Sequence, residues 1–291
     1  MSKVALTHPE KVLWPKTDAT PAFTKADLFA YYEKAAERIL PHIVRRPLSI
    51  VRAPDGIGGE RFFQRHMMEG FPNLEPIAAK GEKKPFLSIA GEDGLLELAQ
   101  IAALEFHPWG CVKGDPDIPE RIIFDLDPAP GMDFPRVVEA AKELRDRLER
   151  CGLVPFLKTT GGKGLHVVAP VKGGSWDDAR AFTRKLAEAA EQDSPGRYTT
   201  NMRKSARDKK LFIDYLRNAR SATAVAPWSP RSRAGATVAV PVAWSKATAK
   251  LDPRRFTLKS AAAFLRAADP WAGMAKAARS LDAAMKRLAK S

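Results

Sequence analysis

The stretch between residues 121 and 216 constrains the fold more than any other part of the chain. It alternates strand and helix patterns in the order strand, helix, two strands, helix, strand, at residues 121–127, 135–152, 154–160, 164–170, 176–192 and 210–216. Only a glycine turn separates the two middle strands, so they form an antiparallel hairpin, since parallel strands need a crossover of about a dozen residues. Hairpins mixed with helices predict an α+β fold rather than a strictly parallel doubly wound sheet.

Weaker patterns flank this stretch. A capping-box pair, Thr24 and Asp27, begins a helix that runs to about Leu40. Two strands are expected at 47–54 and 61–66, and a short helix running into a strand at 94–106. Two closing helices are expected at 258–268 and 274–289. We expect one domain over residues 1–291. Its parts are an N-terminal α/β subregion over about 1–110, a catalytic core over about 111–250 and C-terminal helices over about 251–291.

The distribution of charge restricts the class of partner. The chain has 48 Lys and Arg against 34 Asp and Glu, and residues 201–291 hold 20 of these basic but only 5 of these acidic side chains. Such a surplus favours nucleic acid or another polyanion, with a solvated surface as the alternative. No apolar run approaches the roughly 20 residues that cross a bilayer, so we expect a cytoplasmic protein without membrane partners. Two cysteines, Cys111 and Cys151, argue against a disulfide framework or a zinc site.

Two aspartates stand two residues apart in the segment IIFDLDP. On a strand, Asp125 and Asp127 leave the same face. Like charges this close need a shared proton, solvent or a divalent cation, and oxygen ligands suit Mg²⁺ or Mn²⁺. Asp214 lies in the apolar pattern LFIDY, where an unpaired acid is costly. Three converging aspartates predict two-metal phosphoryl transfer, with a solvated strand end as the alternative for the D-x-D pair.

Other polar clusters suit a phosphorylated substrate. In TTGGKGLH, the glycines can expose backbone N–H groups to an anion, and Lys163 and His166 add donors; an ordinary hairpin turn is the alternative. Arg231 and Arg233 in PRSRAGA, and Arg217 after Asp214, suit triphosphate oxygens, with a solvated charge run as the alternative.

An aromatic pair suits nucleic acid. Phe62 and Phe63 stand between Arg61 and Arg65, so rings that stack on bases alternate with cations that hold phosphates, unless the pair is core.

Together these segments resemble the polymerase domain of bacterial ATP-dependent ligase D, an end-joining repair enzyme in the archaeo-eukaryotic primase superfamily. The resemblance covers nearly the whole chain, and its segments follow in the family's order: EKVLWPKT, RFFQRH, LEFHPWG, FDLDP, TGGKGLH, FIDYLRN and RSRAGATVAVPVAW. It implies an RRM-like primase-polymerase core sheet with flanking helices, joined to an N-terminal subregion.

The resemblance also implies a role for individual residues. Asp125, Asp127 and Asp214 match metal-binding carboxylates that hold two Mn²⁺ or Mg²⁺ ions, without zinc. The positions that match groups around the incoming nucleotide are His107, Thr160, His166, Arg217, Arg231 and Arg233. Phe62 and Phe63 match aromatics that stack on template bases, and Lys11 and Lys25 match a site that reads a 5′-phosphate.

The implied activity is nucleotidyl transfer in non-homologous end joining. The family adds nucleotides, with ribonucleotides preferred, to a primer 3′-hydroxyl, both template-directed and untemplated, and fills gaps at 5′-phosphorylated breaks. The implied partners are DNA ends, gapped or primer-template DNA, NTP or dNTP, a Ku-type protein and a DNA ligase, in the bacterial nucleoid. Two alternatives remain at this point: a haloacid-dehalogenase-like phosphatase that uses the D-x-D pair, and a non-catalytic module that binds DNA ends.

Overall fold

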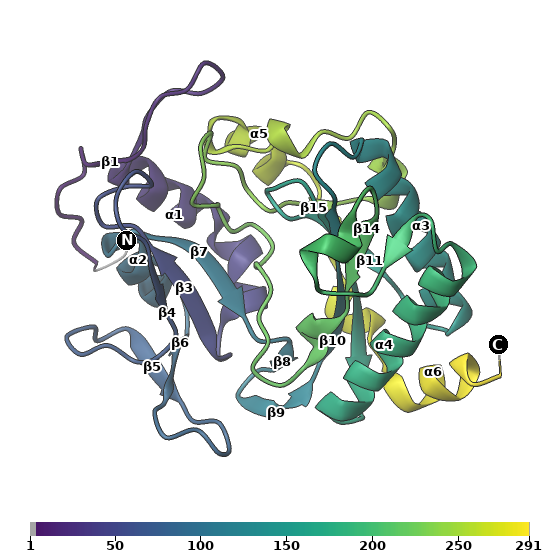
Figure 1. Ribbon diagram of the computed structural model, residues 1–291. Coiled ribbons are helices and arrows are strands. Elements are labelled where there is room, and N and C mark those ends of the chain that lie inside the picture. The colour runs from purple at the N-terminus through teal and green to yellow at the C-terminus, as the bar shows by residue number, and fades with distance from the viewer. Residues whose placement is uncertain (1–3, 291) are drawn as a thin grey trace.

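The computed structural model describes residues 4–290 and consists of two packed halves, one built around the N-terminal sheet and one around the central sheet (Figure 1). The α-helices are α1 Lys25–Ile43, α2 Glu92–Gln100, α3 Phe134–Arg150, α4 Trp176–Asp193, α5 Ala261–Arg266 and α6 Leu281–Leu288. Both α1 and α4 begin with a capping box, the first at the predicted pair Thr24 and Asp27. Among the described residues, no helix is long and apolar enough to span a bilayer.

The central sheet has the strand order of an RRM. Its four main strands are β10 Arg121–Pro128, β11 Phe156–Thr159, β12 Leu165–Lys172 and β14 Leu211–Asp214. The chain runs β10-α3-β11-β12-α4-β14, and the strands lie side by side in the order β14-β10-β12-β11, with every neighbouring pair antiparallel. This βαββαβ arrangement confirms the predicted α+β fold and its RRM-like core. Short strands extend the sheet at its edges and are β13 Tyr198–Thr199, β15 Pro241–Val242 and β16 Arg279–Ser280.

Alternation along β10 gives the sheet two different faces. Ile122, Phe124 and Leu126 are fully buried in one hydrophobic cluster with residues of α3 and α4, which cover that side of the sheet (Figure 1). Asp125 and Asp127 therefore point to the opposite face, because successive strand side chains alternate. The helices thus leave one face of the sheet free for polar chemistry.

The N-terminal half contains a smaller antiparallel sheet. Its strands, in spatial order, are β4 Phe62–Gln64, β3 Leu48–Arg52 and β7 Ala103–Pro108. Helices α1 and α2 pack on it, and residues 226–240 return from the central half to join the same hydrophobic core. Peripheral strand pairs are β1 Val12–Trp14 with β2 Phe23–Thr24, β5 Leu74–Ile77 with β6 Phe86–Ile89, and β8 Cys111–Val112 with β9 Asp115–Pro119.

The prediction of a closing helix over residues 274–289 is wrong in its first half. Residues Met274–Ala277 form one 3₁₀ turn, and β16 then pairs in parallel with the end of β12. Helix α6 begins only after Ser280, whose hydroxyl accepts a hydrogen bond from the backbone N–H of Ala283. The alanine-rich composition favours helix throughout, but pairing with the central sheet takes the backbone of residues 279–280 instead.

Candidate active site

Four ionisable side chains form one row across the open face of the central sheet. Asp125 on β10 lies in register with Asp214 on β14 and, on its other side, with His166 on β12. His166 is in register with Lys158 on β11. Cross-strand neighbours have Cβ atoms about 4.5–5.5 Å apart. The sheet register therefore brings together three predicted residues that are up to 89 positions apart, and adds Lys158, which was not predicted.

The surroundings of Asp125 keep its carboxylate ionised. Burial alone would raise its pKa, but His166, with Nε2 3.4 Å from Oδ1, together with Arg217 and Lys158, lowers the pKa to about 2. Burial, reinforced by Lys158, lowers the pKa of His166 to about 4, so its imidazole is neutral at neutral pH. Burial also lowers the pKa of Lys158, which is 2% exposed, to about 7.

Arg217 joins two of the aspartates. Its guanidinium lies 3.1 Å from Oδ2 of Asp214 and 3.5 Å from Oδ2 of Asp125. Burial raises the pKa of Asp214 even though Arg217 opposes that shift, and Asp125 adds to it. The backbone N–H of Leu216 donates to Asp214 at 2.8 Å and fixes the carboxyl group. A cation thus lies between two carboxylates that would otherwise repel each other.

Asp127 lies at the open end of the same strand. Its carboxylate is 3.6 Å from Nζ of Lys163 and 3.2 Å from a guanidinium nitrogen of Arg207, which stacks on the ring of Phe212. Lys163 also donates a hydrogen bond to the carbonyl of Pro128 at 2.8 Å. The lysine of the glycine turn is therefore held over the D-x-D pair.

The glycine turn after β11 packs directly on β10. A Cβ at Gly164 would lie 2.4 Å from the carbonyl oxygen of Leu126, so a larger residue cannot stand there without moving the turn. Gly161 has a φ of +65°, and a Cβ there would lie 2.6 Å from Cγ of Arg231. Arg231 donates to the carbonyl of Thr160, whose hydroxyl donates to the carbonyl of Gly164 at 3.1 Å. The glycines thus allow the turn and Arg231 to pack closely together.

Glu105 on β7 connects two predicted nucleotide-binding residues. Its Oε2 accepts from Nε of Arg231 and bonds to Nε2 of His107, each at 2.9 Å, and its Oε1 accepts from the backbone and hydroxyl of Ser232 at 2.7 Å. Burial would raise the pKa of Glu105, but these partners hold it well below its usual range. Sequence reasoning missed Glu105, although it lies between Leu104 and Phe106 and so shows the same signal as Asp214, an acid inside an apolar strand.

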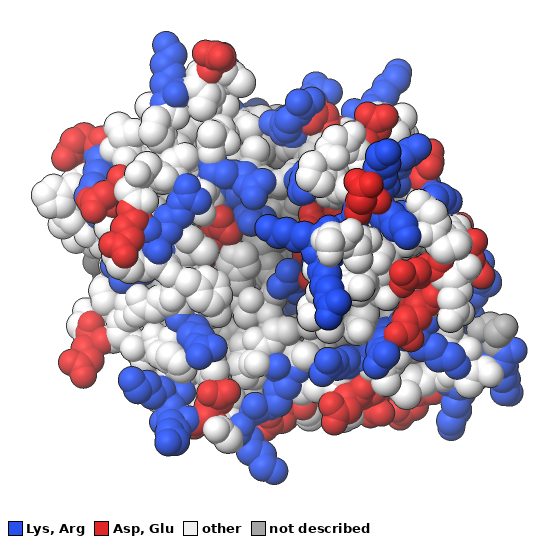
Figure 2. Space-filling model, viewed as in Figure 1, with Lys and Arg blue, Asp and Glu red and all other residues white. Residues whose placement is uncertain are grey.

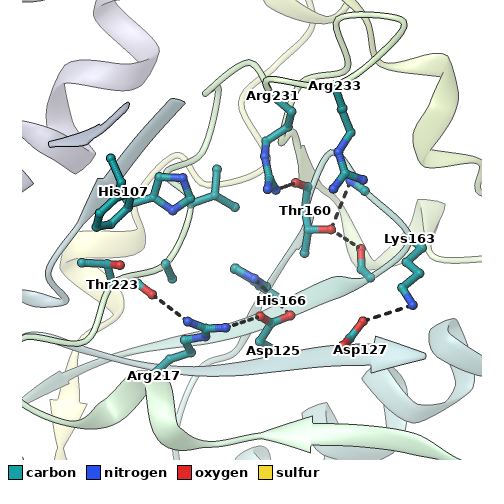
Figure 3. A pocket seen from close by; sticks show the side chains of 15 residues that line it. His107, Asp125, Asp127, Thr160, Lys163, His166, Arg217, Thr223, Arg231 and Arg233 are labelled. Carbon is teal, nitrogen blue, oxygen red and sulfur yellow. Dashed lines mark hydrogen bonds and ion pairs between the residues drawn. The ribbon is translucent and has the colours of Figure 1, made fainter. Parts of the chain in front are cut away.

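These side chains surround one cavity of about 580 Å³ between the two halves. Figure 3 shows Arg231 and Arg233 reaching the Thr160 turn from one side, while Asp125 and Asp127 rise from the sheet on the other. Lys and Arg side chains gather around the central hollow of the surface (Figure 2). All seven predicted nucleotide-binding residues line the cavity, and they are His107, Thr160, Lys163, His166, Arg217, Arg231 and Arg233. Asp214 lies beside the cavity through its contact with Arg217.

The carboxylates suit a divalent ion by their chemistry. Asp125, Asp127 and Asp214 supply hard oxygen donors on one sheet face, as Mg²⁺ and Mn²⁺ require. Within residues 4–290, no three acidic, histidine or cysteine side chains form a cluster ready to hold a metal, because each aspartate is turned toward a cation. Asp125, Asp127 and Asp214 are the residues that would hold such an ion.

The predicted DNA-binding residues lie outside this row. Phe63 is 61% exposed, lines the cavity and lies with its ring 6.4 Å from that of His107, whereas Phe62 is exposed beyond the cavity lining. Neither ring is core. Lys11 and Lys25 are brought together away from the cavity, since the backbone N–H of Lys25 donates to the carbonyl of Lys11 at 2.8 Å. Lys11 pairs with Asp55 at 2.7 Å, and Nζ of Lys25 donates to the carbonyl of Thr7.

An RRM-type sheet that presents carboxylates to a cation-lined cavity defines a nucleotidyltransferase of the primase-polymerase class. Residues 24–271 match the family described as "LigD, primase-polymerase domain", and the chain belongs to this family. Enzymes of the family are nucleotidyltransferases that use divalent metal ions. This membership does not support the phosphatase alternative or the non-catalytic module.

Several relatives share this domain within longer proteins. The multifunctional non-homologous end joining protein LigD of Pseudomonas aeruginosa is 34% identical over 292 residues, which cover 98% of this chain and 34% of that protein. Its counterpart in Mycolicibacterium smegmatis is 36% identical over 84% of this chain and 32% of its own length. The polymerase domain of Mycobacterium tuberculosis ligase D, solved in complex with DNA, superposes with a TM-score of 0.84 at 32% identity, covering 95% of this chain and 99% of that one. The chain thus spans about a third of the length of the two full-length LigD proteins.

Proposed function

We propose that the chain extends the 3′-hydroxyl of a primer strand with nucleotides at DNA breaks during non-homologous end joining. The observation that carries this proposal is the row of Asp214, Asp125 and His166, in register on neighbouring strands and facing a cavity lined by arginines. Supporting it, a relative with a TM-score of 0.84 was solved with DNA, and the full-length relatives from Pseudomonas aeruginosa and Mycolicibacterium smegmatis are end joining proteins.

The chain's own residues have distinct roles in this reaction. Lys163, His166, Arg231 and Arg233 hold the triphosphate, with the Thr160 turn beneath it. Asp125, Asp127 and Asp214 hold two Mn²⁺ or Mg²⁺ ions, which supply charge neutralisation at the phosphates and lower the pKa of the attacking hydroxyl. The primer hydroxyl loses its proton to water and its oxygen forms a bond to the α-phosphorus. The bond from that phosphorus to the bridging oxygen of the β-phosphate breaks, and pyrophosphate leaves.

His107 and Glu105 position the site rather than touch the reacting atoms. Glu105 holds Nε of Arg231, so the guanidinium reaches the Thr160 carbonyl in one orientation. His107 bonds to the same carboxylate oxygen and packs near Phe63. The protein side of the cavity is thus ordered before substrate binds, which reduces the free energy spent on ordering it during the reaction.

The DNA lies on the surface beside the cavity. Phe62 and Phe63 stack on template bases near the break, since both rings are exposed and Phe63 also lines the cavity. Lys11 and Lys25 read the 5′-phosphate of the downstream strand in a gap. Ribonucleotides are preferred over deoxynucleotides, and manganese over magnesium. A Ku-type end-binding protein and a DNA ligase act with the chain in the bacterial nucleoid.

Primer extension on a gapped duplex tests the catalytic assignment. With Mn²⁺ and ATP, Asp125→Ala and Asp214→Ala should each abolish extension while DNA affinity, measured by fluorescence anisotropy, stays within about threefold. Asp146→Ala, on the exposed surface of α3, serves as the control and should keep full activity. Extension by either cavity variant would overturn the assignment of the carboxylates.

A second comparison tests the 5′-phosphate site. Lys25→Ala should erase the preference for a 5′-phosphorylated gap over an unphosphorylated one, while extension of a simple primer-template stays unchanged. Lys34→Ala, an exposed lysine of the same helix, is the matched control. A preference that survives in Lys25→Ala would show that another group reads the phosphate.

A further inference from the structure

A second, larger cavity lies at the opposite end of the β10–β12 pair. It has a volume of about 740 Å³ and is bounded by the end of α1, the turn after β8, the first residues of β10 and residues 269–278. Arg121, which lines it, points to the same face of β10 as Asp125 but stands four residues earlier, about 13 Å along the strand. Ile123 and Val168 pack with Trp271 in the apolar cluster between them. The cavity is therefore separate from the proposed active site.

Buried positive charge in this cavity exceeds the negative charge that balances it. The guanidinium groups of Arg46 and Arg121 are 1% and 6% exposed, and both bind the same oxygen of a single carboxylate, Oε1 of Glu120. Lys113 lines the same wall, and burial followed by the charge of Arg46 lowers its pKa, while Glu120 opposes that shift. Arg38 and Asp269, which also line the cavity, pair with each other at 3.5 Å, and Lys113 and Lys276 are exposed. The two buried arginines therefore exceed the one carboxylate that they share by one positive charge, which is costly so close to the protein interior.

One of these arginines also has an unmet hydrogen bond. Nε of Arg121 is buried and finds no hydrogen-bond partner among residues 4–290. Arg46, in contrast, also donates to the backbone carbonyls of Cys111, Pro41 and Val44. A buried guanidinium nitrogen without a partner destabilises the folded chain. An oxyanion in the cavity would remove both the surplus charge and this unmet donor.

Part of the cavity wall is apolar. Trp271 and Met274 are buried side chains that line it, together with Pro41 and Pro170. His42 lies with its ring 5.5 Å from that of Trp271, and burial followed by the charges of Arg121 and Arg46 holds its pKa well below the usual range. The imidazole is therefore neutral and adds no charge to the wall. A volume of this size accommodates a whole small molecule, not a lone inorganic ion.

We propose that this cavity binds a small organic phosphate of about nucleotide size. Its phosphate monoester, which carries close to two negative charges at neutral pH, contacts Arg121, Arg46 and Lys113. Its apolar or ring-shaped body lies against Trp271 and Met274. The site is independent of nucleotidyl transfer, since none of these side chains lines the catalytic cavity.

Calorimetric titration in EDTA, with adenosine 5′-monophosphate and inorganic phosphate as probes, tests the proposal. The wild-type chain should bind the nucleotide more tightly than phosphate, and Arg231→Ala, which alters the catalytic cavity, should keep that binding. Lys113→Glu should weaken it at least tenfold, whereas Lys185→Glu, an equal charge change on the exposed face of α4, should leave it within twofold.

A second variant distinguishes a loss of nucleotide binding from a loss of folding. Arg121→Met leaves the Arg46–Glu120 pair intact and removes the surplus cation, so its thermal midpoint should equal or exceed that of the wild type. Adenosine monophosphate should raise the midpoint of the wild type but not that of Arg121→Met. Four outcomes would each overturn the proposal. They are equal weakening by Lys113→Glu and Lys185→Glu, equal affinity for both probes, no binding at millimolar nucleotide, and loss of all binding in Arg231→Ala.

Discussion

Replacement of Glu105 by glutamine separates the positioning of Arg231 from the chemistry of the aspartates. The carboxylate of Glu105 takes part in four hydrogen bonds, two on each oxygen, with His107, Arg231 and Ser232. A glutamine has one acceptor oxygen and one NH₂ donor, so in either orientation an NH₂ group faces donors on one side. The favoured orientation keeps the oxygen toward the charged Arg231 and loses the backbone N–H of Ser232.

The cost follows from these contacts. The bond to Arg231 changes from one between two charges to one with a neutral acceptor, which weakens it by about 1 kcal/mol, and the unmet N–H of Ser232 costs about 1–3 kcal/mol. The unfolding free energy should therefore fall by about 2–4 kcal/mol. Because the guanidinium then reaches the triphosphate in several orientations, the KM for ATP should rise about 10- to 100-fold, which corresponds to roughly 1.4–2.8 kcal/mol.

Denaturant unfolding and steady-state primer extension measure the two effects separately. Glu97→Gln is the matched control, because Glu97 is also buried but accepts one hydrogen bond, from the backbone of Asn73, far from the cavity. It should lose about 1 kcal/mol of stability and keep its KM within twofold. A Glu105→Gln protein that loses stability but keeps the wild-type KM would refute the reasoning and show that the Thr160 carbonyl alone orients Arg231.

Three further predictions concern the turn, the row and the DNA surface. Gly164→Ala should lower the unfolding free energy by at least about 2 kcal/mol and depress extension, because its Cβ meets Leu126, whereas Gly196→Ala, which has open space, should do neither. Burial lowers the pKa of Lys158 to about 7 from 10.5, so the unfolded chain binds more protons between these pH values and wild-type stability rises with pH there. Lys158→Met should therefore be more stable than the wild type at pH 6 by a margin that shrinks toward pH 10; a constant margin in denaturant unfolding would contradict this. Phe63→Ala should raise the Kd for primer-template about 5- to 100-fold in anisotropy titrations without changing the thermal midpoint, and an unchanged Kd would place the template elsewhere.

Local patterns were sufficient to predict the parts of the site that lie on single strands. Asp125 and Asp127 share a face because their spacing matches the strand period, and a hairpin on either side of TGGKG follows from the shortness of the turn. The convergence of Asp214 on this pair was expected but depends on a register that pairs Asp125 with a residue 89 positions later, which no local pattern determines. The cost of an unpaired acid in an apolar strand suggested the convergence, and the resemblance to a known family then implied one metal-binding role for all three aspartates.

The residues that sequence reasoning missed act through distant contacts. The role of Glu105 depends on its contact with Arg231, 126 positions later. The role of Lys158 depends on its place in the row with His166 and Asp125. The error over residues 274–289 has the same origin, since helix propensity is local but the pairing of β16 with β12 is not. Tertiary contacts therefore determine the roles of Glu105 and Lys158 and the path of the C-terminal residues. Local chemistry is sufficient for the D-x-D pair and the glycine turn.

The return of residues 226–240 to the N-terminal core also affects the order in which the protein can fold during synthesis. The carbonyl of Trp228 accepts a hydrogen bond from the hydroxyl of Tyr31 at 2.7 Å, and Ala236, Val238 and Ala261 complete the same core. A ribosome that adds 5–20 residues per second needs roughly 8–30 s to pass from residue 110 to residue 261. During that interval the N-terminal half lacks part of its core, whereas βαββαβ strands of the central sheet are complete by Asp214. The four main strands can thus pair on the nascent chain before the N-terminal core closes, whereas β15, β16 and α6 join the central half later.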